Sequence, residues 1–209
     1  MARVDDFYAA AGLAKKVLEE QNPKRIADRS GAGFIPGEDG GAVLTLKFLN
    51  RDLRITWPGL EFSDSASGDE VSIQQQVLLL HYLEGAGAAT TGRWIAYQEV
   101  PDGKFYLDAF LRRAKNPLVQ GFGENPERLV EAARELYAAQ PLDQGDVSVA
   151  VTALPTVPVA LILWKGDEEF PPEGTILFDR SISGILSAED IAWLAGMVVY
   201  PLLGLAGKR

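Results

Sequence analysis

The sequence predicts an α+β fold in a single domain, residues 1–209, in which mostly antiparallel hairpins alternate with about four helices. Two patterns predict this fold. Apolar residues recur at helical spacing in four segments, and pairs of apolar stretches joined by short turn sequences lie between these segments. Hairpins favour antiparallel pairing, which distinguishes this pattern from a doubly wound α/β sheet. With 209 residues the chain can bury a core without disulfides or structural metals.

The first predicted elements are a helix and a hairpin. Residues 5–21 carry apolar side chains at helical spacing, and Asn22-Pro23 ends this helix. A glycine-rich loop follows at residues 30–41. Residues 42–50 and 53–57 then alternate apolar and polar side chains on either side of a polar turn, which predicts a β-hairpin.

A second helix and a second hairpin follow in the sequence. Residues 72–84 are predicted to be helical, with glycines just past their end. Residues 94–100 and 104–110 are predicted to be paired strands, because Pro101-Asp102-Gly103 lies between them. In such a turn, proline presets φ and glycine permits a positive φ.

The last part of the chain is predicted to form a helix, a strand pair and a final helix. Residues 125–141 form the third helix, which starts at an Asn-Pro pair that suits a helix N-terminus. Residues 146–154 and 157–164 form a third strand pair, and residues 175–179 add a short strand. The final helix is predicted at residues 187–203, with a serine cap and acidic residues in its first turn.

The composition excludes several kinds of site. The chain has 20 Lys and Arg against 29 Asp and Glu, and its formal net charge of −9 argues against nucleic acid and anionic membranes as partners. It contains no cysteine, so it can form no disulfide and can ligate no iron–sulfur cluster through its own cysteines. It contains one histidine, which excludes sites that need two from one chain.

The two ends of the sequence predict a cytoplasmic protein. The first residues lack the apolar segment of a secretory signal, and acidic residues follow them closely. Residues 191–206 are uncharged, but they are fewer than the roughly 20 apolar residues of a membrane-spanning helix, and Pro201 interrupts them. We therefore expect a buried terminal helix and no membrane association.

The densest group of chemically active side chains follows the third strand pair. It comprises Trp164 and the acidic residues Asp167, Glu168 and Glu169, and Asp179 ends the next apolar run. Carboxylates at strand ends could bind Mg²⁺ or Ca²⁺ through oxygen, or could act as general acid and base if burial separates their pKa values. The alternative is a solvated acidic turn without chemistry.

His81, Arg93 and Tyr97 are the other candidate ligand-binding residues. His81 lies in the second predicted helix, where it could be a general base or an axial ligand to a cofactor, or a histidine held in the core by one hydrogen bond. Arg93 and Tyr97 belong to the second predicted hairpin, which is rich in aromatic and basic residues. Its aromatic side chains could stack on bases or pack on the core, and its basic residues could line a pocket for an anionic small molecule.

Several segments together resemble those of a known family. They are Gln76–Leu83, Gly92–Tyr97 followed by Pro101-Asp102-Gly103, Ala153-Leu154-Pro155, and Trp164–Pro171 running into Ile176–Asp179 and Ser187–Asp190. On these segments, most of the chain resembles an uncharacterised domain family found mainly in anaerobic bacteria and archaea. Some members of that family carry an added iron–sulfur cluster domain. The resemblance implies the cytoplasm of an anaerobe and a place near redox or one-carbon metabolism. It implies no activity and no catalytic residues.

These observations support three functional hypotheses. The first is a small-molecule or cofactor-binding accessory domain in anaerobic metabolism, whose pocket involves His81, the acidic turn at 167–169, Asp179 and either Arg93 or Tyr97. The second is a protein-interaction module without catalysis, with an iron–sulfur or redox protein as its partner and an exposed apolar patch near residues 197–205. The third is a carboxylate- and metal-dependent enzyme. The sequence identifies no particular cofactor.

Overall fold

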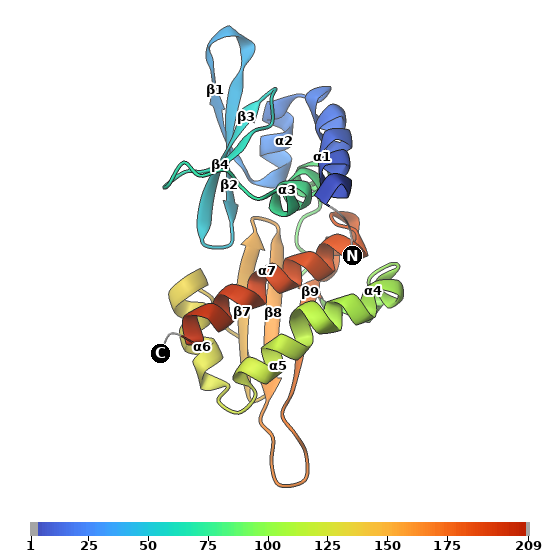
Figure 1. Cartoon of the computed structure of the whole chain (residues 1–209), viewed down its shortest axis with the longest axis vertical. Coiled ribbons are helices and arrows are strands. Elements are labelled where there is room, and N and C mark those ends of the chain that lie inside the picture. Colours follow the sequence, from blue (N-terminus) through green and yellow to red (C-terminus); the bar gives the residue numbers. More distant parts are fainter. Residues whose placement is uncertain (1–3, 208–209) are drawn as a thin grey trace. The chain divides into compact units, whose positions relative to one another are not determined.

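The computed structural model of the chain describes residues 4–207 and shows an α+β fold with two antiparallel sheets (Figure 1). The predicted fold class is therefore confirmed. The chain divides into two compact units: the first comprises Met1–Ala89, Leu154–Thr156 and Gly184–Leu186, and the second comprises Thr90–Ala153, Val157–Ser183 and Ser187–Arg209. The organisation as a single domain stays a prediction. The first three residues, on which the argument about a leader partly rests, and the last two residues lie outside the described residues.

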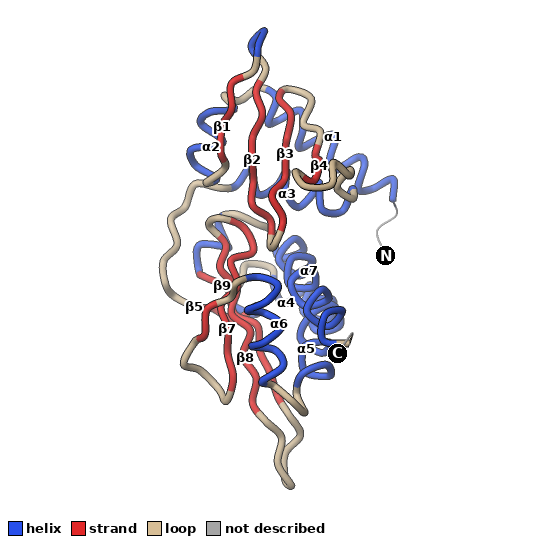
Figure 2. The backbone as a smooth tube through the Cα atoms, turned by 90° about the vertical axis from the view of Figure 1, so that its left-hand side faces the viewer, coloured by secondary structure: helices blue, strands red, loops and turns tan. Residues whose placement is uncertain are grey.

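The first unit is a four-stranded sheet with helices on one face (Figure 2). The strands, in the order in which they pair, are β1 (Gly33–Pro36), β2 (Ala42–Phe48), β3 (Arg51–Trp57) and β4 (Phe62–Asp64). The helices on that face are α1 (Val4–Glu19), α2 (Pro23–Ser30) and α3 (Ile73–Gly85). A single 3-10 turn, η1 (Glu38–Gly40), lies between β1 and β2.

The predicted hairpin at 42–57 is confirmed as β2 and β3. Leu44 lies opposite Ile55, and Leu46 lies opposite Leu53. All four side chains are fully buried, so the alternation in the sequence placed one face of the hairpin in the core. The helix predicted at 72–84 is likewise confirmed as α3.

The Asn22-Pro23 pair after α1 not only ends that helix, as predicted, but also begins a second one, α2. The side-chain oxygen of Asn22 accepts hydrogen bonds from the amides of Lys24 and Arg25 at 2.9 and 3.2 Å, and Pro23 takes the first helical position. Helix α2 was not predicted because it has only eight residues, most of them polar. Strand β1 was also missed, because it lies inside the segment predicted as a glycine-rich loop.

The second unit is a five-stranded sheet with helices packed on one face (Figures 1 and 2). In pairing order its strands are β5 (Trp94–Ala96), β9 (Glu173–Asp179), β8 (Val157–Trp164), β7 (Val147–Leu154) and β6 (Gln140–Pro141). Its helices are α4 (Gly103–Phe110), α5 (Asn116–Phe122), α6 (Glu127–Tyr137) and α7 (Ala188–Ala206). Its shorter helical segments are η2 (Tyr97–Glu99), the π-helical segment η3 (Leu111–Lys115), and η4 (Arg180–Gly184). Strands β7 and β8 and helix α6 confirm the predicted third strand pair and third helix.

The prediction of a second hairpin is wrong. Residues 94–96 form β5, but residues 104–110 belong to α4, and β5 pairs with β9 instead. The Pro-Asp-Gly sequence does turn the chain, with Asp102 at a φ of 60°, but the turn leads into a helix. The residues that follow are buried or half-buried at helical spacing, at positions 103, 107, 110 and 114. A strand would have buried every second residue.

Helix α7 is a core helix of the second unit. Its N-terminus has the expected cap: the Ser187 hydroxyl accepts a hydrogen bond from the Asp190 amide at 3.2 Å, and the Asp190 carboxylate accepts one from the Ser187 amide. Among residues 4–207 it is the one helix whose length and apolar composition would allow it to cross a membrane. Eleven of its residues are buried, and it packs against α4 and α6. The expectation of a buried terminal helix is therefore confirmed.

Candidate functional site

Asp179 organises one end of the second sheet. It is the last residue of β9 and is only 3% exposed. Its carboxylate accepts hydrogen bonds from the amides of Thr91, Gly92 and Ser181 and from the hydroxyls of Thr91 and Ser181, at 2.7–3.1 Å. Burial alone would raise the pKa of Asp179, but these hydrogen bonds outweigh burial and lower the pKa to about 2. Asp179 is therefore ionised at neutral pH, and it holds two loops in place.

The two loops that Asp179 holds carry Arg93 and Arg180. The Arg180 amide donates a hydrogen bond to the Arg93 carbonyl at 2.8 Å, so the two backbones adjoin. Both arginines line an open cavity of about 260 Å³, together with Ile95, Glu99, Pro101 and Ser183. Both are exposed, and within the described part of the chain neither guanidinium has an ion pair or a hydrogen-bond partner.

The charges around this cavity favour an anion. Glu99 is the one carboxylate among the described residues that line it, and the Glu99 carboxylate already accepts a hydrogen bond from the Ala96 amide at 2.8 Å. Two arginines therefore line the cavity together with one carboxylate, which is already hydrogen-bonded. A guanidinium offers several N–H donors in a planar fork that matches the oxygens of a carboxylate or a phosphate. We call this the arginine cavity.

Tyr97 is a core residue of the same unit. It is 1% exposed, its hydroxyl donates a hydrogen bond to the Ala188 carbonyl at 2.7 Å, and its ring stacks on Phe110 with 4.2 Å between the ring centroids. Burial is the largest of the influences that raise the pKa of Tyr97 to about 12. Tyr97 is the first residue of η2, and its buried side chain anchors the segment that carries Glu99.

The acidic turn lies in the loop between β8 and β9. Asp167, Glu168 and Glu169 are exposed. The Asp167 carboxylate accepts hydrogen bonds from the Phe170 and Glu169 amides at 2.7 and 2.8 Å, and these bonds lower the pKa of Asp167. The carboxylate thus stabilises its own turn.

The structure does not bring Asp179 and the acidic turn together. Strand β9 separates them, and seven residues of strand span about 20 Å. Trp164 lies at the same end of the sheet as the acidic turn, where it pairs with Glu173 and is 40% exposed. Across residues 4–207, no group of three or more histidine, aspartate or glutamate side chains could hold a metal ion.

His81 lies on α3 of the first unit, where it is half-buried and has an interaction partner. It therefore belongs to a different compact unit from the other seven predicted residues. In the segment at 197–205, for which an apolar patch was expected, Tyr200 is the one large apolar side chain that is exposed among the described residues. Isolated exposed side chains of this kind are normal on protein surfaces.

Sequence reasoning named Arg93 but missed Arg180, Ser183 and Glu99. A signal for Arg180 was available, since it directly follows Asp179 at the end of an apolar strand. The sequence does not indicate that β9 pairs with β5, which makes residues 93 and 180 neighbours.

A family model described as Domain of unknown function (DUF3786) matches residues 22–200 of the chain. This match confirms the resemblance to an uncharacterised domain family. No curated protein and no solved structure matches the chain.

Proposed function

The chain belongs to the family described as Domain of unknown function (DUF3786), and we propose that it binds a small anionic molecule between Arg93 and Arg180. One observation carries the proposal: two arginines with adjoining backbones line one cavity, and neither has a carboxylate partner among the described residues. Adjacent positive charges repel each other, and an anion bound between them is attracted to both, which outweighs that repulsion.

The cavity also indicates what kind of anion fits. A volume of about 260 Å³ lies just below the range of roughly 300–1,000 Å³ that is usual for drug-sized ligands, so we expect a small metabolite. Ile95 and Pro101 provide an apolar wall for a carbon skeleton, and the Ser183 hydroxyl provides a further hydrogen bond. Carboxylates and phosphates carry the oxygens that two guanidinium groups can bind together.

The buried network beneath the cavity supports a binding role. The Asp179 carboxylate accepts its hydrogen bonds from backbone amides and hydroxyls, and it bonds to the guanidinium of neither Arg93 nor Arg180. The loops are therefore held without neutralising the arginines, which keeps the cavity positively charged before a ligand arrives. Because the loops are already held rigidly, binding has less conformational entropy of the protein to remove.

The wider role that we propose is an accessory function in anaerobic metabolism. The resemblance to a family found mainly in anaerobes supports this role, a cytoplasmic location, and an iron–sulfur or redox protein as partner. The net charge of −9 supports a role that involves neither nucleic acid nor a membrane surface.

The test is a calorimetric titration of the full chain with inorganic phosphate and with citrate. Arg93→Gln and Arg180→Gln should each weaken binding by about tenfold, because each removes charge-assisted hydrogen bonds. Arg112→Gln is the matched control, since Arg112 is an exposed arginine of the same unit that does not line the cavity. If Arg112→Gln weakens binding as much as the cavity variants do, or if neither anion binds, the proposal is wrong.

A further inference from the structure

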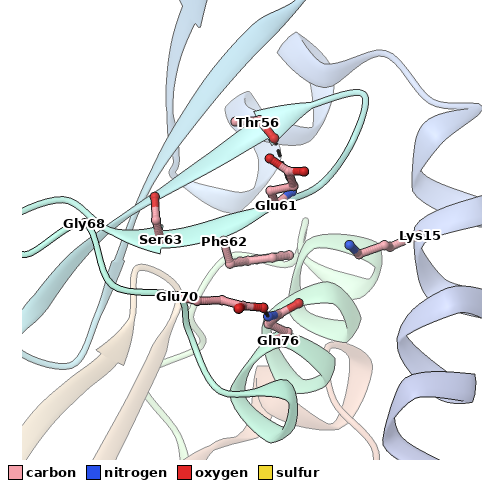
Figure 3. Close-up of a pocket in the computed structure, with 8 residues that line it drawn as sticks. All are labelled: Lys15, Thr56, Glu61, Phe62, Ser63, Gly68, Glu70 and Gln76. Atoms are coloured by element: carbon pink, nitrogen blue, oxygen red, sulfur yellow. Dashed lines mark hydrogen bonds between the residues drawn. The ribbon is translucent and has the colours of Figure 1, made fainter.

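The first unit contains a second cavity with the opposite character. Its volume is about 390 Å³, and it is lined by residues from α1, β3, the turn between β3 and β4, β4, the segment between β4 and α3, and α3 itself (Figure 3). Phe62 extends from β4 between Glu61 on one side and Glu70 with Gln76 on the other, and Lys15 points toward it from α1 (Figure 3).

Gln76 is the polar group of this cavity that is fixed most firmly. It is only 6% exposed, and its Nε2 donates hydrogen bonds to the Val71 carbonyl at 2.7 Å and to the Glu70 carboxylate at 3.2 Å. These two acceptors set the orientation of the amide. Its Oε1 accepts no hydrogen bond from any described residue, and this buried side chain lines the cavity. Among the described residues, Arg29 Nε is the one buried side-chain nitrogen or oxygen that lacks a partner, so Gln76 Oε1 is open to the cavity, where a ligand N–H or O–H group can donate to it.

The other polar groups of the cavity are also mostly acceptors. The Glu61 amide donates to the Thr56 hydroxyl at 3.2 Å, which fixes the backbone of Glu61, but the Glu61 carboxylate has no partner in the described chain. Glu70 uses one oxygen for Gln76 and has the other left. On the donor side, Lys15 has one long contact, 3.5 Å from its Nζ to the Gly59 carbonyl, and Thr56 and Ser63 each have one hydroxyl.

We propose that this cavity binds a small organic cation, a compound with a protonated amine or a guanidinium group. Two carboxylates against one ammonium give the lining a net negative charge, and the free acceptors match a ligand that is rich in N–H donors. The N–H groups of the ligand donate to Gln76 Oε1 and to the carboxylates of Glu61 and Glu70. Phe62, which is only 2% exposed, forms the apolar base of the cavity. This site is independent of the arginine cavity, because it lies wholly in the other unit and selects the opposite charge.

The test uses agmatine as the probe, with succinate as an anionic compound of similar length. The full chain labelled with ¹⁵N is titrated with each compound and followed by amide chemical shifts. We expect agmatine to shift amides around Phe62 and Gln76, and succinate to leave them in place. Glu61→Gln and Glu70→Gln should each weaken agmatine binding by about five- to tenfold, because each removes one charge from the lining.

Glu84→Gln is the matched control. It removes the same charge from an exposed position on α3 that does not line the cavity, so agmatine binding should be unchanged. Glu61→Gln is the safer of the two cavity variants, since the Glu61 carboxylate makes no contact that the fold needs. The proposal is overturned if agmatine causes no shifts, if succinate shifts the same amides, or if Glu84→Gln weakens binding as strongly as Glu61→Gln.

Discussion

Replacing Asp179 with asparagine should destabilise the second unit by about 2–4 kcal/mol at pH 7. The wild-type carboxylate accepts hydrogen bonds from three amides and two hydroxyls. An asparagine side chain keeps one oxygen but places an NH₂ group against N–H donors, which then lose their acceptor in a buried position. The pKa gives an independent magnitude. It is lowered from 3.8 to about 2, and with about 1.4 kcal/mol for each tenfold change in the ionisation constant, ionised Asp179 contributes about 2 kcal/mol.

The sign of the pH dependence follows from the same pKa. Because folding lowers the pKa of Asp179, its contribution is complete above the unfolded value of 3.8 and is lost as the pH falls toward about 2. The wild type should therefore lose stability over that range, whereas Asp179→Asn has no such contribution to lose. The difference between the two proteins should be largest at pH 7 and should shrink below pH 4.

Urea unfolding at several pH values measures this difference, and amide hydrogen exchange at Thr91, Gly92 and Ser181 locates it. Asp167→Asn is the matched control, because Asp167 also accepts two backbone hydrogen bonds but is exposed. Its effect should be much smaller. The reasoning is refuted if Asp179→Asn unfolds like the wild type at pH 7, or if their difference is the same at pH 3 and pH 7. Phosphate binding should also weaken in Asp179→Asn, since the loops of the arginine cavity lose their common anchor.

Three further predictions concern the second unit. Ser187→Ala should cost about 1 kcal/mol in thermal unfolding, because it removes the N-cap of α7. Tyr97→Phe should cost about 1 kcal/mol through the lost hydrogen bond to Ala188; since folding raises the pKa of Tyr97 to about 12, the wild type should also lose more stability than the variant as the pH rises above 10. Gly103→Ala should destabilise by about 1–3 kcal/mol, because its Cβ would lie 2.3 Å from the Tyr97 carbonyl oxygen, whereas the control Gly204→Ala meets nothing within 4 Å.

Elements that depend on local signals could be predicted from the sequence. The β2–β3 hairpin has alternating burial on either side of a short turn, and α7 begins at a serine cap, so both are specified by neighbouring residues. The prediction of a strand at residues 104–110 was wrong because the Pro-Asp-Gly turn before it suits the start of a hairpin and the start of a helix equally well. Only the spacing of the buried residues distinguishes a strand from a helix here, and which residues are buried depends on packing against α7, which is distant in the sequence.

The candidate site shows the same limit. Arg93 could be singled out as a basic residue among aromatic ones, but its partner Arg180 is brought to it by the pairing of β5 with β9. That pairing joins segments more than 80 residues apart, and no local pattern encodes it. Asp179 was named for a different reason from the one that the structure gives. A charged residue at a strand end predicts chemistry, whereas burial shows that this carboxylate is used to hold loops.

At the arginine cavity, the negative charge of Asp179 holds the loops and the positive charges of Arg93 and Arg180 are left for a ligand, and the second role depends on the first. If the Asp179 carboxylate had formed an ion pair with Arg93 or Arg180, the cavity would be neutral and the loops would be held only by long, exposed side chains, which contribute little. Instead the carboxylate is buried and satisfied by five N–H and O–H groups of the loops themselves. The positive charges are therefore left for a ligand. Because the same carboxylate also fixes the backbones of both arginines, the geometry that an anion meets is set before it binds.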